Sequence, residues 1–245
     1  ELRFAIQCYQ LIIIGIQDNP TPSPMNPRKP CRSILMSLFL LGIIFSSVYS
    51  EEISHSFLGL GKANKAVIID EDGKVDWKVD LPTSDGWVLP NGNVLLALYP
   101  TRDFPNGGVV EVDRKTKQHI FAYKGQQKEV STVQALPGNK FLVTQLGPEP
   151  RAIVINRKSE VLQVTPLACQ KQNAHMQTRM LRILPNGNYI APHLLDFAVK
   201  EYDPKTGKVL RTFATDDRGR QKRDWPFTAI RLENGNTLIG CTNGN

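Results

Sequence analysis

Short apolar segments alternate with polar turns along most of this chain. The clearest turn is Leu184-Pro185-Asn186-Gly187-Asn188, with the β-prone residues Met180–Leu184 before it and Tyr189–Ala191 after it. Short β-prone segments on both sides of an Asn-Gly pair predict a β-hairpin, because both residues tolerate the positive φ that a tight two-residue turn requires. We therefore expect antiparallel strands here.

The same turn occurs four times. Its leading residues are Leu89, Leu136, Leu184 and Leu232, which lie 47, 48 and 48 residues apart. A fixed period in this range indicates a repeat architecture, in which each repeat is one supersecondary unit packed on its neighbours.

A second hairpin signal, Asp-x-x-Gly, alternates with the first. It is clear at Val67–Lys74 and Val199–Lys208 and looser at Val109–Asp113 and Ala152–Asn156. Two hairpins in each repeat make a four-stranded antiparallel unit, and such units arranged radially are the blades of a β-propeller. The predicted fold is therefore all-β, a β-propeller of four-stranded antiparallel blades with about four repeats.

The order of the hairpins leaves two interpretations of the ring. An Asp-x-x-Gly hairpin comes first, three pairs of hairpins follow, and an unpaired Asn-Gly hairpin at Phe227–Cys241 comes last. The two single hairpins could join, closing a four-bladed ring that we would expect to be a monomer. The alternative, which we favour, is a fragment of a larger propeller, with further repeats after Asn245.

Residues 1–50 differ from the repeats. Residues 1–24 are assigned as an upstream segment outside the domain, with an extra hydrophobic anchor as the alternative. Residues 25–50 resemble a secretory signal peptide, with Arg28, Lys29 and Arg32 before the apolar run Ile34–Phe45. We expect cleavage after Ser50 and a secreted or periplasmic protein without stable membrane insertion. A retained signal anchor is the alternative, and the β-propeller domain is residues 51–245.

Composition narrows the possible partners. The 245-residue chain has a formal net charge of +7, and its basic residues are scattered through turns, so we do not expect nucleic-acid binding. Only Cys169 and Cys241 follow the expected cleavage site, in different repeats, and they imply no disulfide framework. No CxxC or HExxH motif is present, and we propose no metal.

The repeats support a family resemblance. Asp-x-x-Gly-Lys-x-x-Trp at Asp70–Trp77 and the Leu-Pro-Asn-Gly-Asn turns resemble the quinoprotein-like (PQQ-like repeat) β-propeller superfamily, which includes arylsulfotransferase-like propellers. The resemblance covers roughly residues 60–245 and implies that Trp77 packs between neighbouring blades. Phe121 and Arg211 replace that tryptophan in other repeats. We expect no bound quinone, because no adjacent cysteine pair and no convincing carboxylate set is present.

Strand alternation puts the Asn-Gly and Asp-x-x-Gly turns at one end of the blades, here called the turn side. The remaining loops, longer and different from one another, lie at the other end, here called the long-loop side. Function in a repeat scaffold concentrates on such a side. The leading hypothesis is therefore a protein that binds an unknown protein partner or small ligand there.

Candidate site residues follow from the long loops. His175 and His193 bracket one hairpin, with Arg179 close by, and this group could bind an anion or carry out nucleophilic and acid–base chemistry. The resemblance implies an arylsulfotransferase-like or other transferase or hydrolase as the alternative function, although Met176 follows His175 where that family has His-Asp. Gln177, Asp196 and Trp225 are candidate ligand-binding residues. Each candidate also has a structural interpretation, as a hydrogen-bonded loop residue, a turn cap or a packing residue.

Overall fold

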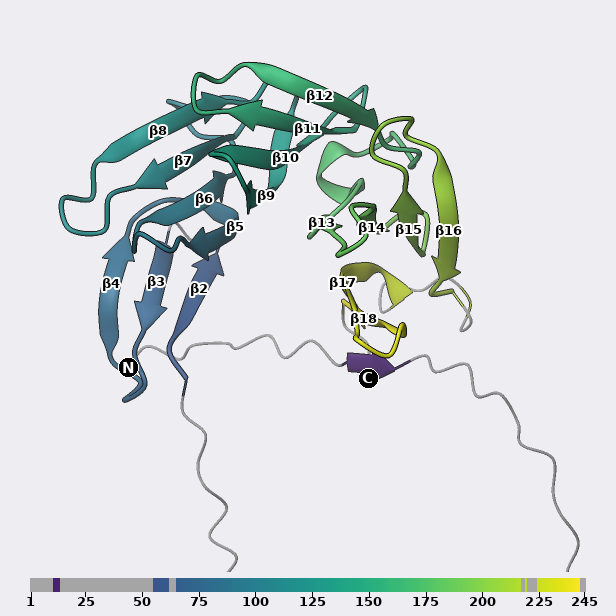
Figure 1. Ribbon diagram of the computed structural model, residues 1–245, viewed down its shortest axis with the longest axis horizontal. Coiled ribbons are helices and arrows are strands. Elements are labelled where there is room, and N and C mark those ends of the chain that lie inside the picture. Colours follow the sequence, from purple (N-terminus) through teal and green to yellow (C-terminus); the bar gives the residue numbers. More distant parts are fainter. Residues whose placement is uncertain (1–10, 14–54, 62–64, 217–218, 220–223, 243–245) are drawn as a thin grey trace, which may run out of the picture. The chain divides into compact units, whose positions relative to one another are not determined.

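The computed structural model of the chain describes residues 11–13, 55–61, 65–216, 219 and 224–242 (Figure 1). The expected signal segment, its cleavage site and most of residues 1–24 lie outside these ranges. Within them, Ala174–Met176 form the 3₁₀ turn η1, and no helix is long and apolar enough to cross a membrane.

Antiparallel strands account for nearly all the regular structure. Three sheets have four strands in sequence order: β5 to β8, β9 to β12, and β13 to β16. Two further sheets have three strands, β2-β3-β4 and β1-β18-β17. The bounds are β1 Leu11–Ile13, β2 Phe57–Gly61, β3 Lys65–Ile69, β4 Val75–Val79, β5 Thr83–Val88, β6 Val94–Leu98, β7 Gly108–Val112, β8 His119–Lys124, β9 Glu129–Leu136, β10 Lys140–Leu146, β11 Arg151–Asn156, β12 Val161–Pro166, β13 Arg182–Ile183, β14 Tyr189–His193, β15 Ala198–Tyr202, β16 Val209–Ala214, β17 Pro226–Arg231 and β18 Thr237–Cys241.

The predicted hairpins are confirmed, but the geometry of the Asn-Gly turn is not the one expected. Gly187 has φ 87°, whereas Asn186 is not among the residues with positive φ. The amide of Gly187 donates to Leu184 O at 2.8 Å, and that of Leu184 donates to Asn188 O at 2.7 Å. Proline in the second position fixes a negative φ, so the turn is of type I, with the glycine alone in the left-handed region.

Apolar clusters join each sheet to the next one along the chain. Trp77 of β4 is 5% exposed, packs with Val94, Leu96 and Val110 of the following sheet, and donates its indole N–H to Arg114 O at 3.0 Å. The expected packing of Trp77 between neighbouring blades is therefore confirmed. Phe121, which replaces the tryptophan in the next repeat, packs on Phe141 at 4.9 Å between ring centroids.

One strand is shorter than expected. The sequence predicts a strand over Met180–Leu184, but β13 begins at Arg182 and pairs only Arg182 with Ile190 and Ile183 with Tyr189. The cause lies at Met180, whose φ of 43° is outside the β region and interrupts the ladder. This irregular approach to β13 carries several of the candidate site residues.

Candidate functional site

His175 lies on the long-loop side, in the turn η1. Asn173 caps this turn, because its side-chain oxygen accepts a hydrogen bond from the His175 amide at 3.1 Å. The His175 side chain is 44% exposed, and its ring lies 5.8 Å from the ring of Tyr99, which follows β6. An imidazole that is half in solvent and fixed by its own backbone is available to a ligand.

The buried side chain of Glu129 holds the His175 ring by a hydrogen bond. This carboxylate is at the start of β9, its side chain is 9% exposed, and its Oε2 lies 2.9 Å from His175 Nδ1. A carboxylate only accepts hydrogen bonds, so Nδ1 carries the hydrogen of this bond, and in a neutral ring Nε2 then presents its lone pair. Among the described residues, Nε2 has no hydrogen-bond partner.

Arg179 completes the group from the other side of Glu129. Its side chain is 4% exposed, with Nη2 3.3 Å from Glu129 Oε1 and Nη1 donating to Thr178 O at 2.9 Å. Nη2 is one of the few buried side-chain nitrogens in the described chain without a hydrogen bond. The guanidinium balances the buried carboxylate and leaves the exposed imidazole as the free end of the network.

Gln177 is buried and bridges two long loops. Its side-chain oxygen accepts from Gly147 N at 2.8 Å, and its side-chain nitrogen donates to Gly147 O at 2.7 Å. The amide is therefore occupied by backbone partners, and it fixes the loop before Arg179 against the loop after β10. This position supports the site rather than offering a free group to a ligand.

His193 is in a different environment from His175. It is fully buried, its Nε2 lies 2.6 Å from Tyr202 Oη, and its Nδ1 lies 3.2 Å from Gln177 O. Burial, reinforced by the charge of Lys200, lowers the pKa of His193 to about 4. The structure thus brings His175 and Arg179 together on Glu129 and gives His193 separate partners.

The two other candidates have backbone or ionic partners. Asp196 accepts from Gln170 N at 2.8 Å and pairs with Lys200 Nζ at 2.5 Å. Trp225 is partly buried just before β17, and its carbonyl accepts from Thr242 N at 2.8 Å. Neither residue makes a described polar contact with His175, Glu129 or Arg179, and their ligand-binding roles stay predictions.

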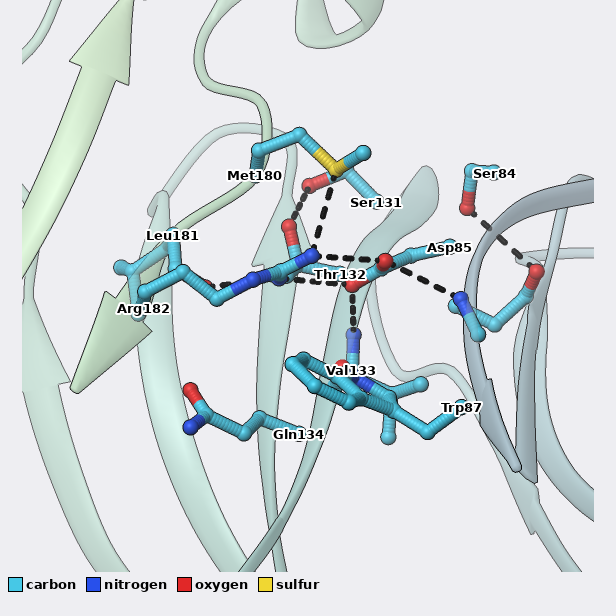
Figure 2. Close-up of polar contacts among 12 residues, drawn as sticks. Ser84, Asp85, Trp87, Ser131, Thr132, Val133, Gln134, Met180, Leu181 and Arg182 are labelled. Atoms are coloured by element: carbon cyan, nitrogen blue, oxygen red, sulfur yellow. Dashed lines mark hydrogen bonds and ion pairs between the residues drawn. The ribbon is translucent and has the colours of Figure 1, made fainter. Parts of the chain in front are cut away.

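A second polar centre joins the first strands of three sheets (Figure 2). Arg182 of β13 donates from Nη1 and Nη2 to the two carboxylate oxygens of Asp85 in β5, both at 2.8 Å. Asp85 also accepts from Val133 N of β9 at 3.0 Å. Figure 2 shows the guanidinium between Met180 and Trp87, with its carbon 5.0 Å from the Trp87 ring centroid. Burial raises the pKa of Asp85, and Arg182 opposes this effect.

Sequence reasoning missed Glu129, Asp85 and Arg182. A signal was present at Arg182, a charged residue inside the β-prone segment Met180–Leu184 that the repeat predicts to be a first strand. Such strands are covered by neighbouring sheets, so a charge there requires an opposite charge or several hydrogen bonds. The signal does not say which charge pairs with which, since Asp85 and Arg182 are 97 residues apart.

Solved structures share this arrangement of sheets. A protein of unknown function from Bacteroides caccae, at 22% identity, covers 77% of this chain with a TM-score of 0.63. The WD40 β-propeller domain of Doa1 and a streptogramin B lyase, each at 12% identity, cover 78% with TM-scores of 0.57 and 0.55. The chain has a β-propeller fold. It spans 65%, 59% and 60% of the lengths of these three structures.

These similarities establish the fold alone, because the sequence identities are low and one fold carries many functions. No protein-family model and no curated protein matches the chain. The functional argument therefore rests on the residues described above. In the described part of the chain, no group of three or more histidine, cysteine, aspartate or glutamate residues is close enough to hold a metal ion.

Proposed function

We propose that this β-propeller binds a small hydroxyl-bearing ligand on its long-loop side, with His175 as the contact. The carrying observation is the exposed imidazole, held at Nδ1 by buried Glu129 at 2.9 Å with Nε2 directed away from that bond. Nε2 of the neutral ring accepts a hydrogen bond, so the ligand must supply a donor, and we assign this donor to a hydroxyl group. Tyr99, whose ring is 5.8 Å from the imidazole, offers an aromatic wall beside it.

Preorganisation supports binding at this place. Asn173 fixes the backbone of His175, and Gln177 joins its loop to Gly147 by two hydrogen bonds. Arg179 places an opposite charge 3.3 Å from the buried Glu129 carboxylate and so holds it in position. A ligand that meets groups already held in position does not have to supply the free energy for ordering them.

The transferase alternative has less support. It requires two histidines and an arginine converging on one substrate, whereas His193 is fully buried and bonded to Tyr202 and to the Gln177 carbonyl. Only His175 presents an exposed ring nitrogen from this set. The similarity to quinoprotein-like and arylsulfotransferase-like propellers remains a prediction from the repeat motifs.

Histidine-ring nitrogen NMR tests the binding proposal, with phenol and methyl glucoside as probes. We expect saturable shifts of His175 Nε2 with one of these probes and an affinity about tenfold lower in His175→Phe, which keeps a flat ring and removes the acceptor. His119→Phe, at an exposed position on β8, is the matched control. Equal affinity in His175→Phe would refute the proposal. If the wild-type protein releases nitrophenol from p-nitrophenyl sulfate and His175→Phe does not, the transferase is favoured instead.

We also propose export. The support is the basic residues Arg28–Arg32, the 12-residue apolar run Ile34–Phe45 and small residues before Glu51. A helix of that run is about 18 Å long, well short of a hydrocarbon core of about 30 Å. N-terminal sequencing of the exported protein should begin at Glu51 or within one or two residues of it. A membrane-bound product that retains Met25 would show that the segment is an anchor.

A further inference from the structure

A pocket lies on the turn side, at the opposite ends of the strands from His175. It has a volume of about 280 Å³. The first strands of four successive sheets contribute to it, together with the turn before β14. Its lining residues are Trp87, Gln134, Arg182, Ile183, Leu184, Pro185, Ile190, Ala229, Ile230 and Arg231.

The polar part of this pocket consists of nitrogen donors. Arg182 donates hydrogen bonds from Nη1 and Nη2 to the Asp85 carboxylate. Arg231 donates from Nη2 to Glu201 and from Nε to Thr237. Arg182 Nε and Arg231 Nη1 have no hydrogen-bond partner among the described residues. Carboxylates therefore hold both guanidinium groups in position, and each group has one nitrogen left that can donate a hydrogen bond to a ligand.

Gln134 adds a third N–H donor to the pocket, and its side-chain oxygen is already used by a backbone amide. Its Oε1 accepts from Ile183 N at 3.1 Å, which orients the amide, and its Nε2 has no partner within the described chain. The two carboxylates that hold the arginines, Asp85 and Glu201, are not among the lining residues. A pocket with three side-chain N–H groups and no side-chain acceptor free suits a ligand that only accepts hydrogen bonds.

The remainder of the lining is apolar. Ile183, Leu184, Ile190 and Ala229 provide aliphatic surface, and Trp87 lies under the Arg182 guanidinium. Planar carboxylates match guanidinium and amide donors in geometry, and ligand pockets typically combine an apolar lining with a few oriented polar groups. We infer that this pocket binds a small organic carboxylate, with its carboxylate group toward Arg182, Arg231 and Gln134 and its apolar body toward the aliphatic residues.

The inference is independent of the proposal for His175, because the two sites share no residue. Gln134→Glu is the informative variant. It keeps the oxygen that accepts from Ile183 N, removes the Nε2 donor, and places a negative charge against the bound carboxylate at nearly unchanged volume. Gln118→Glu, in the exposed turn before β8, introduces the same charge away from the pocket and is the matched control.

The experiment is a titration of the full chain with benzoate and hexanoate, with benzamide as the neutral analogue. It is followed by the indole N–H resonance of Trp87, which donates to Val133 O at 2.6 Å. We expect saturable shifts with benzoate or hexanoate, and binding about tenfold weaker or more in Gln134→Glu, but unchanged in Gln118→Glu.

Three results would overturn the inference. One is the absence of saturable binding of either carboxylate to the wild-type chain. Another is binding of benzamide as tight as that of benzoate, which would show that the carboxylate charge is not recognised. The third is equal affinity in Gln134→Glu, once circular dichroism shows that this variant is folded. The wild-type comparison of benzoate with benzamide decides the question even if the variant does not fold.

Discussion

Acidification should destabilise this protein through one buried side chain. His193 is fully buried and bonded to Tyr202 Oη at 2.6 Å, and burial lowers its pKa to about 4 from an ordinary value near 6.5. Between these two pKa values the unfolded chain binds more protons than the folded one. Stability is therefore complete above the unfolded pKa and is lost as the pH falls through this window.

The magnitude follows from the two pKa values. Linkage gives a loss of about 2 kcal/mol from His193 between pH 7.5 and pH 5, and about 3 kcal/mol once the pH reaches the folded pKa. Charges near the ring do not change the sign: Lys200 lowers the pKa further and Asp196 raises it, but burial is the largest cause. For a domain of ordinary stability this loss is a substantial fraction of the free energy of unfolding.

Urea unfolding followed by circular dichroism at several pH values between 7.5 and 5 measures the effect. His193→Gln keeps a polar group and removes the titration, so its free energy of unfolding should fall about 2 kcal/mol less than that of wild type over this range. His119→Gln, at an exposed position on β8, is the comparison variant. If wild type and His193→Gln lose the same free energy between pH 7.5 and pH 5, the reasoning about the buried imidazole is wrong.

Two further predictions concern the contacts between sheets. Trp77→Ala should lower the free energy of unfolding by about 3–5 kcal/mol in denaturant titrations, because it empties the space between two sheets and removes the hydrogen bond to Arg114 O; a loss below about 1 kcal/mol would contradict this packing role. Arg182→Met should cost about 3–5 kcal/mol, because it leaves the Asp85 carboxylate buried without its cation. Adding Asp85→Asn to that variant should restore part of the stability, and no recovery would argue against the charge explanation.

The repeat pattern predicts most of this fold because its signals are local. An Asn-Gly or Asp-x-x-Gly turn determines a hairpin through its own backbone, and the 48-residue spacing assigns two hairpins to each sheet. The details that depend on tertiary contacts were missed. The shortening of β13 follows from the positive φ of Met180, which comes just before Arg182 and its bond to Asp85, 97 residues away in the sequence.

The candidate site was predicted less completely. His175 and Arg179 were found because they occur in a long loop next to an expected strand, and the structure joins them through Glu129. His193 has the same kind of position in the sequence and is nevertheless part of the interior, since Tyr202 from the neighbouring strand covers it. Exposure depends on which residue packs above each loop, and a single sequence does not contain that information.

The bond between Asp85 and Arg182 has a consequence for cooperativity. In a repeat protein whose units touch only their sequence neighbours, each unit can open with a modest penalty at one or two interfaces, and melting spreads stepwise. Asp85 belongs to the sheet β5 to β8 and Arg182 to the sheet β13 to β16, so this ion pair bridges units that are not adjacent in the chain. It also engages the intervening sheet through Val133 N. Opening the sheet of Asp85 or that of Arg182 breaks the buried charge pair, and opening the sheet between them removes a hydrogen bond from the Asp85 carboxylate. We therefore expect these three units to unfold together.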